Sequence, residues 1–393
     1  MKNVLAVFGT RPEAIKMAPL VNRLKERQNA FNTGVLVTGQ HREMLDSILS
    51  VFNIRPDFDL NIMTSGQDLY DITANVLTGL RDILKQLSPD IVLVHGDTST
   101  SMAAALAAFY RQIPVGHIEA GLRTHNLYNP FPEEINRQLT DRIATWHFVP
   151  AEKAKENLLK ESIRPDNIFV TGNTVIDSLH WSLDKIKREE TVRQKIRETL
   201  AGNGLTAHLL TSWQQHKRRL VLITGHRREN FGEGMQHICE ALIALAKRHP
   251  DCDFLYPVHL NPNVQRPVRE ILAKETLSNV WLLPPLDYLP FIYLMDFSTL
   301  VLTDSGGIQE EAPGLGKPVL VMRETTERPE AVEAGTARLV GTSTEKIVDE
   351  TSILLSDKEK YNRMANAVNP YGDGKACERI VDIIINKNKT PNG

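Results

Sequence analysis

Cysteine is scarce in this chain, and the few cysteines present follow no recognisable pattern. Cys239, Cys252 and Cys377 form neither a CxxC pair nor a dense disulfide framework in a sequence of 393 residues. This spacing argues against structural zinc and fits a reducing compartment. We therefore expect buried free thiols and no metal site.

Long hydrophobic runs and an excess of charge of one sign are also missing. No apolar stretch approaches the ~20 residues of a membrane-spanning helix, and the N-terminus lacks the basic start and cleavage site of a signal peptide. Lys plus Arg number 46 and Asp plus Glu number 48, which gives a formal net charge of -2. This balance gives no general reason to expect a nucleic-acid or membrane partner, so any anion site must be local. We expect a soluble, cytoplasmic protein.

Several familiar catalytic motifs are absent as well. The sequence has no GxSxG elbow, no GxGxxG after a predicted strand and no GK[ST] ending of a Walker A loop. His117-Ile118-Glu119 matches the H-x-E start of a zinc deaminase, but the accompanying PCxxC is missing. Hydrolase, nicotinamide-dependent and zinc-deaminase functions therefore lack their central feature, and we expect no cofactor.

The sequence does contain a regular alternation of short apolar runs and helical patterns. Most of these runs end in a polar or glycine-rich cluster, which is typical of parallel strands joined by helices. One series covers residues 4–8, 35–38, 91–95, 115–118, 147–149 and 168–171. A second series covers residues 220–224, 254–257, 280–283, 300–303 and 319–322. Two such series predict an α/β fold with two Rossmann-like domains.

The length of the chain agrees with this division, because 393 residues suit two domains of roughly 150 to 200 residues. Two domains imply one cleft between them, where we expect the active site. The first crossover is predicted near Asn173. The charged stretch 181–219 predicts a helix followed by an exposed loop, and residues 376–385 predict an amphipathic helix that can pack on either domain.

The loop after the first predicted strand suits an anion. Ligands of open parallel sheets bind beyond the carboxyl ends of the strands. Here Arg11 and Lys16 lie at the start of the following helix, where free amide groups and the positive end of the helix dipole favour phosphate. The alternative is an ordinary tight turn with solvated charges.

Carboxylates follow three further elements of the first series. Asp97 and Glu119 each come directly after an apolar run, and the pair Glu133 and Glu134 follows a proline-stiffened loop. Burial and neighbouring carboxylates can raise a carboxyl pKa into the range useful for proton transfer, so we favour acid–base chemistry here. The structural alternatives are Asp97 as a helix cap, Glu119 as a partner of Arg123, and the glutamate pair as a favourable first helical turn.

The second series carries groups that suit a diphosphate. The cluster containing His226 follows its first run, and a Ser305-Gly306-Gly307 turn follows a later one. Such a turn presents bare amide groups at a helix start. A carboxylate one turn further on, Glu310 or Glu311, can accept ribose hydroxyls.

Ordered segments along nearly the whole chain resemble one family. These segments read GTRPEAIKMAPL, VHGDTST, GHIEAGLRT, PFPEEINR, TGNTVIDSL, TGHRREN, YPVHLNPNV, LTDSGGIQEEAPGLGKPVL and ETTERPEAVEAGT. Together they are similar to the bacterial UDP-N-acetylglucosamine 2-epimerases of the non-hydrolysing type. Residues 205–219 depart from the pattern as a segment longer than usual, which we expect to be a surface insertion.

The resemblance implies a GT-B-like fold, with the final helix crossing back onto the first domain. It places the N-terminal domain at residues 1–173 plus 374–393 and the UDP-binding C-terminal domain at residues 174–373. It also implies anti elimination of UDP to 2-acetamidoglucal followed by re-addition, no nicotinamide, a homodimer, and a role in surface polysaccharide supply.

Site roles follow from the same resemblance, residue by residue. The expected acid, base or orienting carboxylates are Asp97, Glu119 and Glu133, with His226 supporting the diphosphate. The expected substrate-binding residues are Arg11, Lys16, Ser305, Gly306, Gly307, Glu311 and Arg328.

Some relatives are activated by a second UDP-N-acetylglucosamine molecule. The residues available for such an effector site are Gln40, His41 and Arg227, but Glu43 replaces a glutamine and residues 61–67 contain no arginine. Because a glutamate repels a diphosphate and the missing cation removes a charge-assisted contact, we expect a weakened effector site.

Other functions remain open at this stage. A hydrolysing epimerase would release UDP and free N-acetylmannosamine, and a GT-B glycosyltransferase would need an acceptor groove. A nucleotide-sugar sensor would keep the diphosphate site and lose the carboxylates, which this sequence retains.

Overall fold

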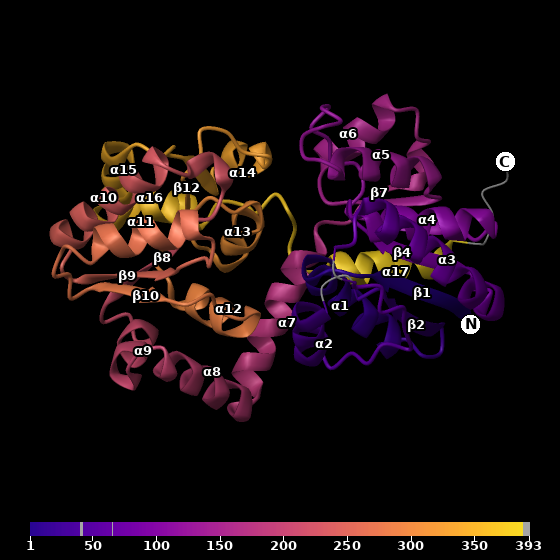
Figure 1. Cartoon of the computed structure of the whole chain (residues 1–393), viewed down its shortest axis with the longest axis horizontal. Helices are drawn as coiled ribbons and strands as arrows, with labels where there is room; N and C mark the ends of the chain where they lie inside the picture. The colour runs from indigo at the N-terminus through magenta and orange to yellow at the C-terminus, as the bar shows by residue number, and fades with distance from the viewer. Residues whose placement is uncertain (40–41, 65, 388–393) are drawn as a thin grey trace. The chain divides into compact units, whose positions relative to one another are not determined.

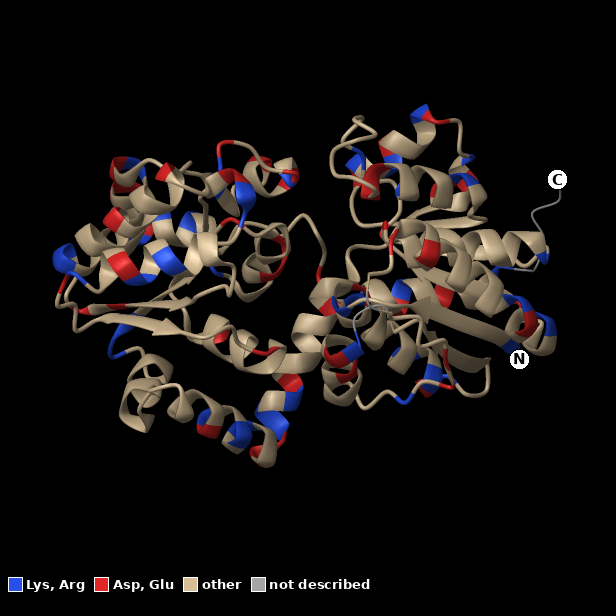
Figure 2. Cartoon of the chain, viewed as in Figure 1, with Lys and Arg blue, Asp and Glu red and all other residues tan. Residues whose placement is uncertain are grey.

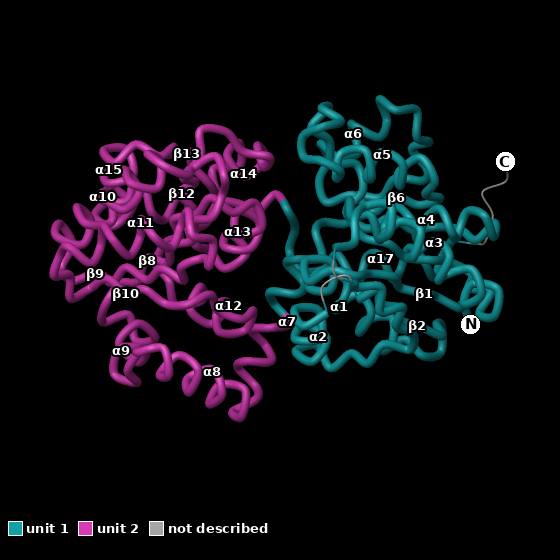
Figure 3. Tube along the Cα trace, viewed as in Figure 1, with its two compact units in different colours: residues 1–180, 371–393 teal, residues 181–370 magenta. Residues whose placement is uncertain are grey.

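In the computed structural model, which describes residues 1–39, 42–64 and 66–387, the chain forms two compact units (Figure 3). Unit 1 comprises residues 1–180 and 371–393, and unit 2 comprises residues 181–370. The boundaries expected from the resemblance were 173/174 and 373/374. The first unit boundary falls inside helix α7 (Thr174–Arg188), so this helix belongs partly to each unit.

Unit 1 is built on a seven-stranded parallel sheet in the order β3-β2-β1-β4-β5-β6-β7 (Figure 1). Its strands are β1 (Lys2–Phe8), β2 (Phe31–Val37), β3 (Phe58–Asp59), β4 (Ile91–His95), β5 (Val115–Ile118), β6 (Trp146–Val149) and β7 (Ile168–Val170). All five residues of β4 are buried, as expected for a parallel strand covered on both faces. The order reverses between β1 and β4, which is where ligands of such sheets bind.

The helices of unit 1 form two neighbouring groups. Helix α4 contacts α3 and α5, while α1 contacts α2 and α17. The C-terminal helix α17 is therefore part of unit 1, where Asp177 accepts hydrogen bonds from the amides of Ala376 (3.1 Å) and Cys377 (2.9 Å). The helices are α1 (Arg11–Glu26), α2 (Arg42–Val51), α3 (Leu69–Leu87), α4 (Ser99–Tyr110), α5 (Glu133–Ile143), α6 (Glu152–Lys160) and α17 (Ala376–Asn386).

Unit 2 contains a six-stranded parallel sheet in the order β10-β9-β8-β11-β12-β13. Its strands are β8 (Arg219–Thr224), β9 (Cys252–Pro257), β10 (Val280–Leu283), β11 (Leu300–Thr303), β12 (Val319–Val321) and β13 (Ala337–Leu339). Its helices after α7 are α8 (Glu190–Gly202), α9 (Ala207–Gln214), α10 (Glu233–Arg248), α11 (Pro262–Leu272), α12 (Tyr288–Phe297), α13 (Gly306–Glu311), α14 (Pro329–Glu333), α15 (Thr344–Ser356) and α16 (Lys358–Ala365). The two-domain α/β prediction is confirmed.

The prediction of an exposed loop within residues 181–219 is wrong. This stretch continues α7 and then forms α8 and α9, so the expected surface insertion is a packed helix. The side chain of Trp213 on α9 is fully buried, and its Nε1 donates to Asp253 Oδ2 at 2.8 Å. Arg218 pairs with the same carboxylate at 2.7 Å. The buried apolar residues of α9 and the contact of Trp213 with Asp253 fix this segment as a helix. Its polar composition alone had indicated a loop.

Other surface and composition features match the sequence. All three cysteines are free and buried. Lys and Arg are interspersed with Asp and Glu on both units (Figure 2). Among the described residues, none of the helices is both long enough and apolar enough to cross a membrane.

The Trp213 anchor predicts a difference between two tryptophan substitutions in unit 2. Trp213→Phe removes the donor to the buried Asp253 carboxylate, and a hydrogen bond to a charged group contributes about 1.5–3 kcal/mol. Trp281→Phe is the matched control, since Trp281 Nε1 is buried with no hydrogen-bond partner among the described residues. Chemical unfolding should show a clear decrease in the free energy of unfolding for Trp213→Phe and a smaller decrease for Trp281→Phe. Equal decreases would mean that the loss of ring volume, and not the loss of the hydrogen bond, destabilises the protein.

Candidate active site

The loop after β1 is held by a buried glutamate. Thr10 caps α1, and Glu13 Oε2 accepts hydrogen bonds from the amides of Gly9 (3.0 Å) and Thr10 (2.8 Å). Glu13 Oε1 accepts from Thr98 Oγ1 (2.6 Å) and Ser101 Oγ (2.9 Å). Because both carboxylate oxygens accept hydrogen bonds, Glu13 has a structural role and connects this loop to the start of α4. Arg11 is the first residue of α1.

Glu119 directly follows β5 and adopts a left-handed backbone conformation with φ of 62°. Such a φ is uncommon for a residue with a side chain and persists where surrounding contacts fix it. Here Lys16 Nζ forms an ion pair with Glu119 Oε2, and Asn173 Nδ2 donates to the same oxygen at 2.7 Å. Lys16 therefore contacts a carboxylate of the site, and the carboxylate gains two fixed donors.

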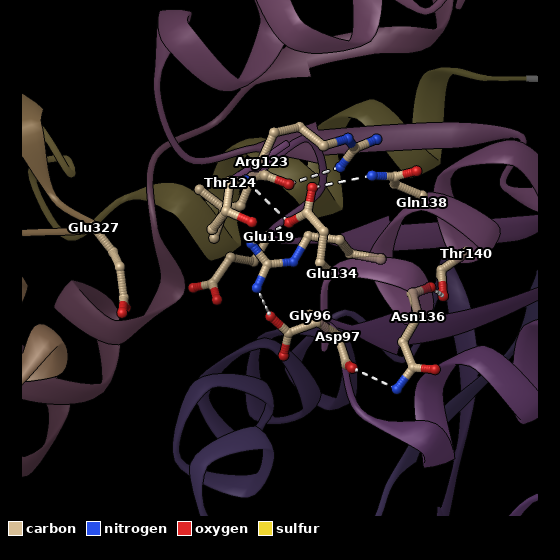
Figure 4. Close-up of polar contacts among 12 residues, drawn as sticks. Gly96, Asp97, Glu119, Arg123, Thr124, Glu134, Asn136, Gln138, Thr140 and Glu327 are labelled. Carbon is tan, nitrogen blue, oxygen red and sulfur yellow. Dashed lines mark hydrogen bonds and ion pairs between the residues drawn. The ribbon is translucent and has the colours of Figure 1, made fainter. Parts of the chain in front are cut away.

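Asp97 follows β4 and is not the cap of the next helix. The cap of α4 is Thr98, whose side chain accepts from the amide of Ser101 at 3.0 Å. Asp97 Oδ2 instead pairs with Arg137 of α5 at 2.6 Å, and the Asp97 carbonyl accepts from Asn136 Nδ2 at 3.0 Å (Figure 4). Burial raises the pKa of Asp97; Arg137 opposes this rise, and the charge of Glu119 adds to it.

The two glutamates that open α5 have different surroundings. Glu134 is fully buried, and its carboxylate accepts from the amides of Thr124 (3.0 Å) and His125 (3.1 Å) and from Gln138 Nε2 (3.0 Å). These hydrogen bonds lower the pKa of Glu134 despite its burial. Glu133 Oε2 is buried with no hydrogen-bond partner among the described residues. Glu134 therefore fixes the loop, while Glu133 keeps an oxygen available for other chemistry.

The structural alternative, in which Glu119 is the partner of Arg123, does not describe Arg123. Arg123 Nη2 pairs with Asp141 at 2.8 Å, and Arg123 Nε pairs with Glu161 at 2.7 Å. The ring nitrogens of His117 contact Asp141 Oδ1 (2.6 Å) and the carbonyl of Gly96 (2.7 Å). His117 and Glu119 therefore have different roles. His117 contacts the backbone of the turn before Asp97, whereas Glu119 belongs to the candidate site.

The loop after β8 in unit 2 is organised by Asp304, which follows β11. Asp304 Oδ2 accepts hydrogen bonds from the amides of His226 and Arg227, both at 2.8 Å, and from Asn230 Nδ2 at 3.2 Å. The ring of His226 stacks on that of His259 with centroids 5.3 Å apart. Burial lowers the pKa of His226, so a neutral imidazole is favoured in the unliganded state.

The glycine turn of unit 2 leaves space above its backbone. A Cβ atom at Gly307 would meet nothing within 4 Å among the described residues, and one at Gly306 would meet Arg227 Nη2 at 3.7 Å. Packing inside the unit therefore does not explain why glycine occupies position 307. Ser305 precedes α13, and its amide donates to Thr303 Oγ1 at 2.9 Å. This open turn next to a guanidinium group suits an anionic ligand.

The remaining predicted residues of unit 2 are near the same turn in sequence. Glu310 is buried and pairs with Arg328 Nε, so Glu310 is engaged as a partner of that arginine. Glu311 Oε1 accepts from the hydroxyl of Tyr288 at 3.4 Å. Of the proposed effector residues, Gln40 and His41 lie outside the described residues, whereas Arg227 lies beside Gly306.

Sequence reasoning missed three residues that position the site. Arg137 is one helical turn after Glu133, so its spacing predicts a shared helix face but not a contact with Asp97. Asn173 comes from a segment far from Glu119 in sequence, and Asp304 was passed over beside the more conspicuous Ser-Gly-Gly turn. The signal for Asp304 was its place directly after an apolar run.

Comparisons with known proteins identify the family to which the chain is similar. The family described as UDP-N-acetylglucosamine 2-epimerase matches residues 23–385. Proteins of that name from Campylobacter jejuni and Escherichia coli (strain K12) are 54% identical over 385 residues and 55% identical over 383 residues, and each alignment covers 98% of both chains. The crystal structure of UDP-GlcNAc 2-epimerase from Neisseria meningitidis bound to UDP-GlcNAc has 52% identity and a TM-score of 0.85. It covers 98% of this chain and 100% of that chain.

The pairing of Arg137 with Asp97 predicts a titration shift. Arg137→Gln removes the cation that opposes burial, so the pKa of Asp97 should rise further. Arg142→Gln, on the same helix but exposed, is the control and should leave this pKa unchanged. Carbon-13 NMR of aspartate-labelled protein, assigned with Asp97→Asn, measures both. An unchanged Asp97 pKa in Arg137→Gln would contradict the assigned role of Arg137.

Proposed function

The chain belongs to the UDP-N-acetylglucosamine 2-epimerase family, and from that premise we propose that it interconverts UDP-N-acetylglucosamine and UDP-N-acetylmannosamine without net hydrolysis. The observation that carries the proposal is the group of carboxylates at the ends of β4, β5 and the start of α5. Burial raises the pKa of Asp97 against the opposing effect of Arg137, and the charges of Glu119 and Glu133 raise it further, which favours proton transfer by this carboxyl group.

We propose that the reaction proceeds by elimination and re-addition. One carboxylate removes the proton from C2 of the sugar, and the electron pair of that C–H bond forms the C1–C2 double bond as the C1–O bond to UDP breaks. A proton then returns to the opposite face of C2, and a phosphate oxygen of UDP reforms the bond to C1. Atoms and charge balance without a redox cofactor, since the hydrogen leaves and returns as a proton.

The charged groups of unit 2 suit the leaving group in this scheme. Fixed donors that face developing negative charge are the usual large contribution to such catalysis. We propose that His226, the Ser305-Gly306-Gly307 turn and Arg328 stabilise the diphosphate, and that Glu311 holds the ribose. The proposal requires these groups and the carboxylates of unit 1 to act on one substrate molecule, with Arg11 and Lys16 contributing cations.

The biological setting is part of the same proposal. We propose that the enzyme acts in the cytoplasm as a homodimer and supplies a precursor for bacterial surface polysaccharide. The family relationship supports each of these statements, and none of them is needed for the chemistry above.

Solvent deuterium tests the reaction type. Incubation with UDP-N-acetylglucosamine in deuterium oxide should yield UDP-N-acetylmannosamine with deuterium at C2, because the abstracted proton exchanges with solvent. Proton NMR and mass spectrometry measure the product. Free N-acetylmannosamine with an equal amount of UDP would identify a hydrolysing epimerase, and complete retention of the C2 hydrogen would exclude this elimination route.

Neighbouring glutamates give a matched test of the carboxylate roles. Glu133→Gln should lower turnover by ~10²–10⁴ while UDP affinity stays within about a few-fold, because an amide cannot move a proton. Asp97→Asn and Glu119→Gln should behave similarly. Glu134→Gln should mainly lower the unfolding temperature, since Glu134 holds the amides of Thr124 and His125. Turnover near wild type in all three former variants would make these carboxylates structural.

The weakened effector site has a kinetic consequence. The reverse reaction, started from pure UDP-N-acetylmannosamine, should proceed without added UDP-N-acetylglucosamine, because Glu43 and the lack of an arginine in residues 61–67 disfavour a second diphosphate. Initial rates with and without a trace of the gluco sugar measure the effect. An absolute requirement for that trace would mean that the effector site is intact.

A further inference from the structure

One oxygen of the fully buried Asp304 carboxylate has no hydrogen-bond partner among the residues that the structure describes. Asp304 is fully buried, and its Oδ2 accepts all three of the hydrogen bonds described above. Its Oδ1 has no hydrogen-bond partner among the described residues. An unpaired buried carboxylate oxygen is costly, so such an atom calls for an explanation.

The nearest ring nitrogen offers that explanation. His226 Nδ1 lies 3.6 Å from Asp304 Oδ1, just beyond hydrogen-bond range. The His226 side chain is 41% exposed, so one edge of the ring faces the carboxylate while the ring keeps access to solvent and ligand. Asp304 already fixes the backbone of His226, so only the ring has to move for Nδ1 to reach hydrogen-bond distance of Oδ1.

The charges around His226 act in opposite directions. Burial lowers its pKa most; the carboxylate of Asp304 raises it, and the neighbouring His259 and Arg227 lower it. Together these effects favour the neutral imidazole in the unliganded state. Binding of an anion would add a second negative group and favour the imidazolium form.

We propose that Asp304 is a positioning residue whose Oδ1 accepts the Nδ1–H of protonated His226 when a nucleoside diphosphate binds to Nε2, so that ligand and proton bind together. The proton comes from solvent and returns to solvent when the ligand leaves. The carboxylate thus holds the ring with both nitrogens as donors, one to Asp304 and one to the diphosphate. This inference rests on the proposed role of His226 at the diphosphate.

The substitution Asp304→Asn separates this role from loop anchoring. The amide carbonyl can take the place of Oδ2 and accept the three hydrogen bonds from the loop. The amide NH2 group then faces His226 Nδ1 and requires a lone pair there, which favours the neutral ring with its proton on Nε2. The variant should therefore keep the loop and lose the imidazolium state.

Histidine NMR titration of the unliganded protein tests the coupling without any reliance on activity. Asp304→Asn should lower the pKa of His226 by about one unit or more, because an opposite charge is removed. His259→Asn is the control of opposite sign and should raise the same pKa, since His259 lowers it. An unchanged His226 pKa in folded Asp304→Asn would overturn the proposal.

Calorimetry of UDP binding in buffers of different ionisation enthalpy tests the ligand half. Wild type should take up protons on binding UDP near neutral pH, and Asp304→Asn should lose most of this uptake. Equal uptake in both proteins would contradict the role of Asp304, whereas failure of wild type to bind UDP would contradict the proposed function.

Wild-type protein supplies a second measurement should the variant fold poorly. Saturation with UDP should produce a downfield Nδ1–H resonance of His226, and this resonance should be absent in His226→Asn. UDP-saturated wild type without such a resonance would also overturn the proposal.

Discussion

The ion pair between Lys16 and Glu119 joins segments that are far apart in the sequence, and the carboxylate site of unit 1 depends on it. Lys16 comes from α1, Glu119 follows β5, and Asn173 adds a hydrogen bond from the segment before α7. These donors hold Glu119 in a left-handed conformation that a side chain otherwise disfavours. A partly buried carboxylate with fixed donors has a defined direction for proton transfer, which a solvated one lacks.

In each unit, a buried carboxylate fixes the backbone of a loop that carries candidate site residues. In unit 1, Glu13 accepts the amides of Gly9 and Thr10 and thereby fixes the residues just before Arg11. In unit 2, Asp304 accepts the amides of His226 and Arg227. Each carboxylate accepts hydrogen bonds from the loop backbone, so the side chains of the loops remain available for a ligand. Preorganisation of this kind costs no rearrangement during the reaction.

Much of the fold was predictable because parallel strands buried on both faces leave a clear apolar signal. Strands β4, β5, β10 and β11 have the bounds that the apolar runs predict. The short edge strands β3 and β13 were missed, since each contains a charged residue, Asp59 or Arg338, and so forms no continuous apolar run. The helix α9 was mistaken for a loop because its burial depends on the tertiary contact between Trp213 and Asp253.

The candidate site was predictable in composition but not in pairing. Strand ends mark Asp97, Glu119 and Asp304 as residues at a sheet edge, whereas the choice of Arg137 for Asp97 and of Lys16 for Glu119 depends on side-chain geometry. Helix spacing also could not separate Glu133 from Glu134, since both lie in the first turn of α5. The hydrogen bonds that Glu134 accepts from the loop amides, and the lack of a hydrogen-bond partner for Glu133 Oε2 among the described residues, distinguish them.

The central claim is that the C1–O bond to UDP breaks reversibly while the carboxylates of unit 1 move the C2 proton. Positional isotope exchange tests this claim directly, with UDP-N-acetylglucosamine that carries oxygen-18 in the bridge between C1 and the β-phosphorus. The account predicts that the bond breaks and that the β-phosphate of UDP rotates before re-addition, so the label should move from the bridge to the non-bridging β-phosphate oxygens in recovered UDP-sugar. Phosphorus-31 NMR resolves the two positions. Epimerised product that retains all of the label in the bridge would contradict the account.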